Sequence, residues 1–345
     1  MDAILLHHGQ STPATHQEEH YCIIVEGYQL LSRLLRINRE SRDAALSFYR
    51  IRLPCWITKD VSSIDGLAPG TVYYNPEYDF LQVMPENMDV VEFFYDLKSK
   101  YDPRRIGLLN LAVEETQLNR EDGLITSRWR QNSPALRKAF IETISQLEEV
   151  FFVSVQKVVR QVLGRDAGAL TMHKSIFNRS FPIMAQALKF DRISRDPRSI
   201  GHDLSNLFIS RNPRSLLDSW QRMLDTLDIN PSRGQYRILL AFEPIGSQNA
   251  IFNRKSAEKW LQKEDDLWTG SHQSTGPFSS LNLKKIAPAQ LGEFRQDQGE
   301  AVKPAIGFWL FPIETFPEQS STGPRTFIYN VGEHWPELGL FRVHE

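Results

Sequence analysis

The segments LLSRLLRINRESRDAALSFYR (residues 30–50) and TVYYNPEYDFLQV (residues 71–83) carry the patterns around which we expect the chain to fold. In the first segment, apolar residues recur at spacings of three and four, which is the period of one face of a helix. They are Leu31, Leu34, Leu35, Ala45, Leu46, Phe48 and Tyr49. The middle of this face instead carries Asn38, Ser41 and Arg42, and polar groups buried there need hydrogen-bond partners. The sequence therefore predicts an amphipathic helix with a polar centre.

The charges of this helix predict how its polar centre is satisfied. Glu40 and Arg42 are two residues apart, so on a helix they point in different directions. Glu40 lies one turn after Arg36 and can reach it, which leaves Arg42 to donate to backbone carbonyls or to a carboxylate elsewhere. We expect Arg42→Ala to lower the free energy of unfolding by about 1–3 kcal/mol, because the change would strand a buried partner.

The second segment predicts a β-hairpin. Residues 71–74 and 79–83 are rich in β-branched and aromatic side chains, and Asn75-Pro76 between them is a turn signal. Asp79 directly follows this turn and is a candidate partner for one of the helix arginines. A structural network that holds the helix to the hairpin is the favoured interpretation, with a ligand site as the alternative, since paired polar groups inside a fold are usually structural.

These residues resemble the fungal two-EXR domain, a family named for two Glu-x-Arg motifs. The second motif matches Asn38-Arg39-Glu40-Ser41-Arg42, and a later signature matches Tyr74-Asn75-Pro76-Glu77 and Asp79. The family's first motif lies upstream, in a Leu-Pro-x-Glu-Leu-Arg segment similar to the start of an F-box. The corresponding region here reads HQEEHYCIIVEGYQL (residues 16–30) and contains neither Leu-Pro nor Glu-x-Arg. The resemblance covers about residues 30–113.

The resemblance implies a non-enzymatic protein-interaction module with unidentified protein partners, because the family has no established activity. By analogy with the F-box, a substrate adaptor of a ubiquitin ligase is the sharper alternative. An enzyme with an unrecognised site is a second alternative. Nucleic-acid binding through the Arg-rich residues 30–52 and 192–214 is a third, and the net charge of −2 disfavours it.

Composition limits the other function classes. The 345 residues are 41% hydrophobic and 24% charged, as in ordinary globular proteins. Cys22 and Cys55 form neither a disulfide framework nor a Cys-x-x-Cys site, and no secretory signal or membrane-length apolar run is present. We therefore expect an intracellular protein, cytoplasmic or nuclear. Because no dinucleotide fingerprint, P-loop, nucleophile elbow or zincin motif occurs, the sequence predicts no catalytic residue and no cofactor.

One metal-binding pattern lies near the start of the chain. His16-Gln17-Glu18-Glu19-His20 matches H-x-x-E-H, in which two histidines one helical turn apart can bind zinc. His16 and His20 are therefore candidate metal ligands. The segment is polar and rich in histidine, so we interpret it instead as a mobile leader.

The chain order predicts three regions and an α/β fold. They are a leader at residues 1–27, a two-EXR-like domain at 28–115, and an α/β region at 116–345 with an exposed insertion near 269–302. We expect the helix and hairpin to lead into alternating strands and helices around a buried, largely parallel sheet. The expected strands are 106–113, 150–155, 235–242 and 305–311, and the expected helices are 90–101, 134–146, 213–227 and 255–262.

Overall fold

The computed structural model of the chain describes residues 3–6, 23–26, 34–58, 67–83, 90–114, 118, 129–157, 159–160, 178–187, 189–210, 212–231, 234–244, 249–269, 302–318 and 328–343. It groups into two compact units. Unit 1 comprises Met1–Ser154, Leu188–Phe190 and Pro213–Ile238, and unit 2 comprises Val155–Ala187, Asp191–Asn212 and Leu239–Glu345. Helices and strands are interspersed along the chain, so the predicted α/β class is confirmed.

Unit 1 contains a layer of parallel strands in the order β1-β5-β6-β7. The strands are β1 (Ala3–Leu6), β5 (Phe80–Val83), β6 (Asn110–Glu114) and β7 (Glu149–Gln156), of which the last two residues of β7 belong to unit 2. β6 and β7 are almost entirely buried, as the apolar runs at residues 106–113 and 150–155 predict.

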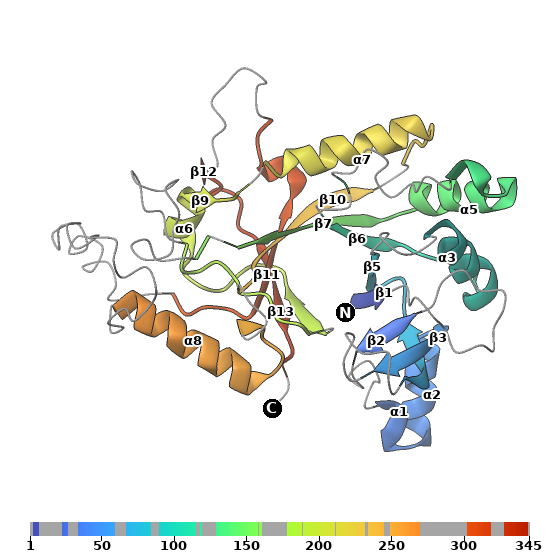
Figure 1. Cartoon of the computed structure of the whole chain (residues 1–345), viewed down its shortest axis with the longest axis horizontal. Coiled ribbons are helices and arrows are strands. Elements are labelled where there is room, and N and C mark those ends of the chain that lie inside the picture. The colour runs from blue at the N-terminus through green and yellow to red at the C-terminus, as the bar shows by residue number, and fades with distance from the viewer. Residues whose placement is uncertain are drawn as a thin grey trace. The chain divides into compact units, whose positions relative to one another are not determined.

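The helical elements of unit 1 that follow β5 include the three helices expected at residues 90–101, 134–146 and 213–227. They are α3 (Val90–Asp96), the π-helical turn η2 (Leu97–Tyr101), the 3₁₀ turn η3 (Trp129–Gln131), α5 (Pro134–Ser145) and α7 (Arg214–Thr226). Ser133 caps α5, with its hydroxyl accepting from the Leu136 N–H. α3 lies beside α5 (Figure 1), where the rings of Phe94 and Phe140 stack 5.8 Å apart. The Trp220 ring of α7 packs on the Phe152 ring of β7, with the ring centroids 6.2 Å apart.

A small sheet in unit 1 has the order β2-β3-β4, next to two short helices. The elements are β2 (Ile24–Glu26), α1 (Leu34–Ile37), α2 (Arg39–Phe48), β3 (Ile51–Thr58) and β4 (Ala68–Tyr74). β4 pairs antiparallel with β3, whereas β5 belongs to the parallel layer. The predicted hairpin of residues 71–74 and 79–83 is therefore wrong, because the turn connects two different sheets.

The partner of β4 is a strand that the sequence interpretation leaves as a loop. Along β3, Ile51, Leu53 and Cys55 are buried while Arg52 and Pro54 are exposed, which is the alternation of a half-buried strand. The proline on the exposed side obscures this pattern, since proline rarely occurs inside strands.

Two strands fall within residues 1–27, where the sequence predicts a leader outside the fold. β1 pairs with β5, and β2 pairs parallel with β3. Ile23 beside β2 is 3% exposed. The isolated run Ala3–Leu6 and the run that contains Ile23 are each too short to predict a strand without knowledge of the strand they join.

Unit 2 is built on strands in the order β10-β11-β13-β8 and a separate pair of short strands, β9 and β12. The strands are β8 (Phe190–Ile193), β9 (Leu207–Phe208), β10 (Gln235–Phe242), β11 (Gly307–Pro312), β12 (Ile328–Tyr329) and β13 (Glu337–Phe341). The division between the units passes through β8 and β10 as well as β7. β11 and β13 are antiparallel, and a Cβ on Gly339 would lie 2.2 Å from the Phe308 ring, so only glycine fits there.

The helical elements of unit 2 are α6 (Gly201–Ser205), α8 (Arg254–Thr269) and the 3₁₀ turn η8 (Ile313–Thr315). α8 continues seven residues beyond the predicted end at residue 262. Residues 270–301, which form most of the predicted insertion, lie outside the described residues.

Candidate functional site

The Asn75–Asp79 turn is closed by its own polar side chains. The Asn75 N–H donates to the Asp79 carboxylate at 2.9 Å, and the Asn75 side-chain oxygen accepts from the Glu77 N–H at 3.1 Å. The Tyr78 and Asp79 N–H groups both donate to the Asn75 carbonyl. Asn75 and Asp79 are 4% and 3% exposed. These two residues of the matched signature thus form the inside of a tight turn.

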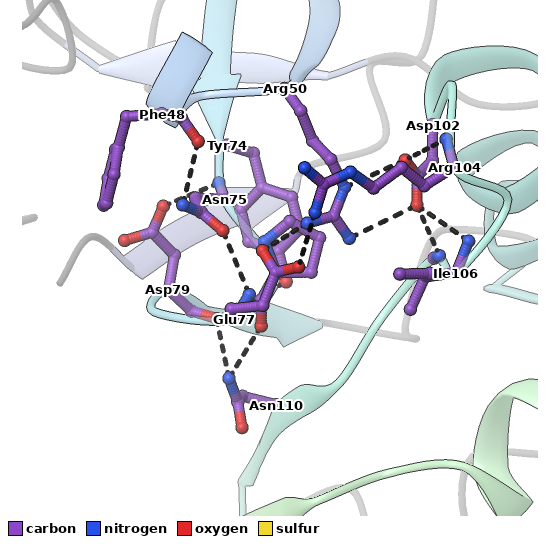
Figure 2. A network of polar contacts seen from close by, with 12 residues as sticks. Phe48, Arg50, Tyr74, Asn75, Glu77, Asp79, Asp102, Arg104, Ile106 and Asn110 are labelled. Carbon is purple, nitrogen blue, oxygen red and sulfur yellow. Dashed lines mark hydrogen bonds and ion pairs between the residues drawn. The ribbon is translucent and has the colours of Figure 1, made fainter. Parts of the chain in front are cut away.

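The turn is tied to its neighbours on two sides, as Figure 2 shows. The Asn75 amide donates to the Phe48 carbonyl at 2.8 Å, which satisfies an end group of α2. On the other side the buried Asn110 amide, at the start of β6, donates to the Pro76 carbonyl at 2.8 Å and to the Asp79 carbonyl at 3.3 Å. The sequence interpretation treats Asn110 only as part of an apolar strand, so it misses this role.

Tyr74 lies beneath the turn and is fully buried. Its hydroxyl donates to the Asp79 carbonyl at 3.5 Å. Burial, reinforced by the negative charge of Asp79, raises the pKa of Tyr74 well above its ordinary value. The phenol is therefore neutral at physiological pH and acts as a packed hydrogen-bond donor.

Arg50 and Asp102 are the centre of the ionic network. The Arg50 Nε lies 3.0 Å from the Asp102 carboxylate, and its Nη1 contacts Glu77 (Figure 2). The Arg50 and Asp102 side chains are 9% and 0% exposed. Arg104 adds a second, outer cation at 3.6 Å from Glu77. The arginine that contacts the turn from the first sequence segment, at Glu77, is thus Arg50, two residues beyond the end of α2.

The Asp102 carboxylate also accepts three backbone N–H groups, from Arg104, Ile106 and Gly107, at 2.8–2.9 Å. Burial acts to raise the pKa of Asp102, but the bonds from Arg50 and from these N–H groups outweigh it, so the pKa is lowered. For Arg50, burial acts to lower the pKa, but the bonds to Glu77 and Asp102 outweigh burial, so the pKa is raised. Both groups are ionised at neutral pH.

The backbone around Asp102 explains how its carboxylate comes to face inward. The Asp102 N–H donates to the Leu97 carbonyl five residues earlier, so a π turn ends the helix and rotates Asp102 away from its α-helical direction. Arg105 (φ 55°) and Gly107 (φ 79°) then let the chain close around the carboxylate. The Asp102-Pro103 pair predicts the end of the helix but gives no sign of this network.

The Glu-x-Arg residues of α2 lie mostly at the surface. Asn38 caps the helix by accepting from the Ser41 N–H at 2.7 Å, and Arg39 forms an exposed pair with Asp43 at 3.8 Å. Arg42 donates to the Leu35 carbonyl at 2.9 Å, one of the two kinds of partner expected for it. Arg42 itself is exposed while its partner residue Leu35 is buried, so removing the guanidinium should cost less than the sequence suggests.

Ala45 is the only residue of α2 that is buried, and Glu40 is exposed. The side chain of Arg36, the predicted partner of Glu40, lies outside the described residues.

Two large side chains at this end of unit 1 are exposed. Phe48 and Tyr78 are 43% and 55% exposed, with ring centroids 5.1 Å apart. The turn network places them together, because Asn75 fixes the Phe48 carbonyl and closes the turn that carries Tyr78.

The metal candidates His16 and His20 lie outside the described residues. Within the part of the chain that is described, no group of three or more His, Cys, Asp and Glu residues could hold a metal ion. Cys55 is buried in β3, and burial raises the pKa of its thiol to about 11. The thiol is therefore protonated and unreactive at neutral pH.

Unit 2 contains a serine–aspartate–histidine arrangement that sequence reasoning could not find. The Ser180 hydroxyl donates to Asp203 at 2.6 Å, and His202 lies 3.7 Å from the same carboxylate. A catalytic triad needs histidine between serine and aspartate, whereas here aspartate lies in the middle. Ser180 is also 0% exposed, so this arrangement is structural.

The Arg-rich residues 192–214 largely make contacts inside unit 2. Arg192 contacts Glu337, Arg195 lies 4.6 Å from the Trp335 ring centroid, and Arg198 contacts the buried Asp196. The Trp309 indole donates to the same carboxylate at 2.7 Å. These contacts leave fewer cations for an external phosphate than the sequence suggests.

Comparisons with known proteins add no relative to this geometry. No family model, no curated protein and no solved structure matches the chain. Among the described helices, none combines the length and the apolar character needed to cross a membrane.

Proposed function

We propose that this protein is a non-enzymatic protein-interaction module of the two-EXR type, acting inside the cell. The observation that carries the proposal is the exposed aromatic pair of Phe48 and Tyr78. Exposed aromatic side chains fixed in one place are favourable contacts for a protein partner, because they bury large areas at little entropic cost.

The rigid support beneath the pair favours the same proposal. Asn75, Arg50, Asp102 and Asn110 hold the turn through buried hydrogen bonds, so Tyr78 is presented without the ordering cost of a flexible loop. The matched signature would then act as a scaffold, and the residues beside it as the contact surface.

The test is a pull-down of the tagged protein from its host, with partners identified by mass spectrometry. A Phe48→Ser/Tyr78→Ser double variant should lose the partner, with at least a tenfold drop in recovery, because it removes the aromatic surface and keeps both backbone hydrogen bonds. Phe252→Ser is the matched control, since Phe252 is 44% exposed in unit 2.

The identity of a partner lost in this way would sharpen the function. A cullin scaffold and its adaptor would define a substrate adaptor of a ubiquitin ligase, and other proteins would define another binding role. If every partner is retained by the double variant while circular dichroism shows that it is folded, the proposed surface is wrong.

A further inference from the structure

Exposed cations lie in η2 and in the short segment that follows it, and one of them contacts the turn that carries Tyr78. Arg104 is 66% exposed and reaches Glu77, the residue before Tyr78 (Figure 2). Arg105 is exposed, and its guanidinium has no ion-pair or hydrogen-bond partner among the described residues. Lys100, also exposed, lies 5.1 Å from the Tyr101 ring centroid.

A second segment adds another cation to this surface. Arg52 on β3 is exposed and has no ion-pair partner within the described part of the chain. It lies two residues after Arg50, or about 7 Å along the strand. Arg50 is bonded to Asp102, so β3 and the segment that carries Arg104 lie side by side at this point.

Two acidic groups of the described residues that lie at this segment, Asp102 and Glu77, are already engaged. Asp102 is fully buried and bonded to Arg50 and to three N–H groups. Glu77 is 35% exposed and is shared between Arg50 and Arg104. Among the described residues, the side of the turn that faces Arg104 and Arg105 therefore carries excess positive charge, although the whole chain has a net charge of −2.

Building on the proposed binding function, we infer that the partner is a protein segment with an apolar or aromatic anchor next to acidic side chains. The anchor packs on Phe48 and Tyr78, and the carboxylates face Arg104 and Arg105. Interfaces commonly combine an apolar centre with a charged rim that sets orientation and association rate. Nucleic acid fits less well, because the Glu77 carboxylate lies within the surface and nucleic-acid sites typically contact about 6–10 phosphates.

The experiment selects a phage-displayed library of random dodecapeptides on the immobilised full chain. Enriched peptides are then synthesised with a fluorescent label and titrated with four proteins: the natural chain, Phe48→Ser/Tyr78→Ser, Arg104→Gln/Arg105→Gln, and the control Lys255→Gln/Lys259→Gln, whose two lysines are exposed on α8. A labelled single-stranded oligonucleotide is titrated in parallel.

We expect enriched peptides to carry Asp or Glu beside an aromatic or aliphatic residue. Their Kd should rise about tenfold in the arginine variant, rise further in the aromatic variant and stay unchanged in the control. If peptides bind through the aromatic pair without acidic enrichment or dependence on the arginines, the acidic partner is excluded and the binding surface remains. If no peptide depends on Phe48 and Tyr78, both proposals fail. If the oligonucleotide binds more tightly than the peptides and its binding depends on Arg104 and Arg105, the proposed acidic partner is wrong and the ligand is nucleic acid.

Discussion

The two segments that carry the main sequence patterns, the helix α2 and the turn Asn75–Asp79, differ in where their polar side chains lie. In α2, Arg39, Glu40 and Arg42 are exposed. In the turn, Asn75 and Asp79 are almost completely buried and bonded to the backbone. The helix part therefore presents its charges to solvent, while the turn part uses its polar groups as internal connections.

The difference teaches that a polar residue matters more for stability when its position removes it from water. Arg50, only two residues beyond α2, is buried and bonded to Asp102, whereas Arg42 inside the helix is at the surface. Since buried ionic groups lose water on folding, loss of one partner is far more costly there than at an exposed site. This contrast predicts an order of stability effects.

The largest effect is expected for Asp102→Ala. The change leaves the buried Arg50 guanidinium and three N–H groups without their shared acceptor, so the free energy of unfolding should fall by about 3–5 kcal/mol. Urea denaturation followed by circular dichroism measures it. Asp43→Ala is the control, because Asp43 is 67% exposed and should cost little. If both changes lower the free energy of unfolding equally, the contrast between buried and exposed ionic groups is wrong.

A smaller effect is expected for Asn75→Ala. The substitution removes the bond to the Phe48 carbonyl and the acceptor of the Glu77 N–H, and should cost about 1–3 kcal/mol. Because the Asn75 side chain accepts from the Glu77 N–H, hydrogen exchange should rise first at the Glu77 amide, and then at the Tyr78 and Asp79 amides as the turn loosens. Unchanged exchange at these amides would show that the Asn75 side chain does not hold the turn.

The pH dependence of stability should distinguish the buried carboxylate from the exposed ones. The pKa of Asp102 in the folded protein is lower than its ordinary value of 3.8, so its stabilising contribution is complete above 3.8 and is lost as the pH falls through the folded pKa. The difference in unfolding free energy between the natural chain and Asp102→Asn should therefore narrow below about pH 4. A constant difference across urea titrations at pH 7, 4 and 3 would argue against an ionised Asp102.

The smallest effect is expected for Arg42→Ala, about 0.5 kcal/mol, because the exposed guanidinium donates only one bond, to the Leu35 carbonyl. This value replaces the 1–3 kcal/mol that the sequence suggests. The Arg50→Ala change is the informative comparison, and it should cost several times more. If Arg42→Ala lowers the free energy of unfolding by more than about 2 kcal/mol, Arg42 contributes as a buried residue does and the contrast with Arg50 is wrong.

The contrast also marks where sequence patterns are informative. Runs such as QYRILLAF at residues 235–242 and the Ser133-Pro134 cap predict β10 and α5 closely, because burial on both strand faces and helix capping depend on adjacent residues. The predicted hairpin fails because β4 pairs with the preceding strand β3, whereas β5 pairs with β1 and β6 in another sheet. Pairing partners depend on the whole fold, which no local pattern encodes.

The sequence alone determined the α/β class, the positions of most long strands and helices, and the turn at Asn75-Pro76. These features follow from the hydrophobic period, from capping and from the fixed φ of proline. Only the tertiary structure decided that Arg50 rather than Arg42 is the buried arginine, that Asp102 is its partner 52 residues away, and that Phe48 and Tyr78 are exposed side by side. Burial and ion pairing are properties of distance in space, and folding alone sets those distances.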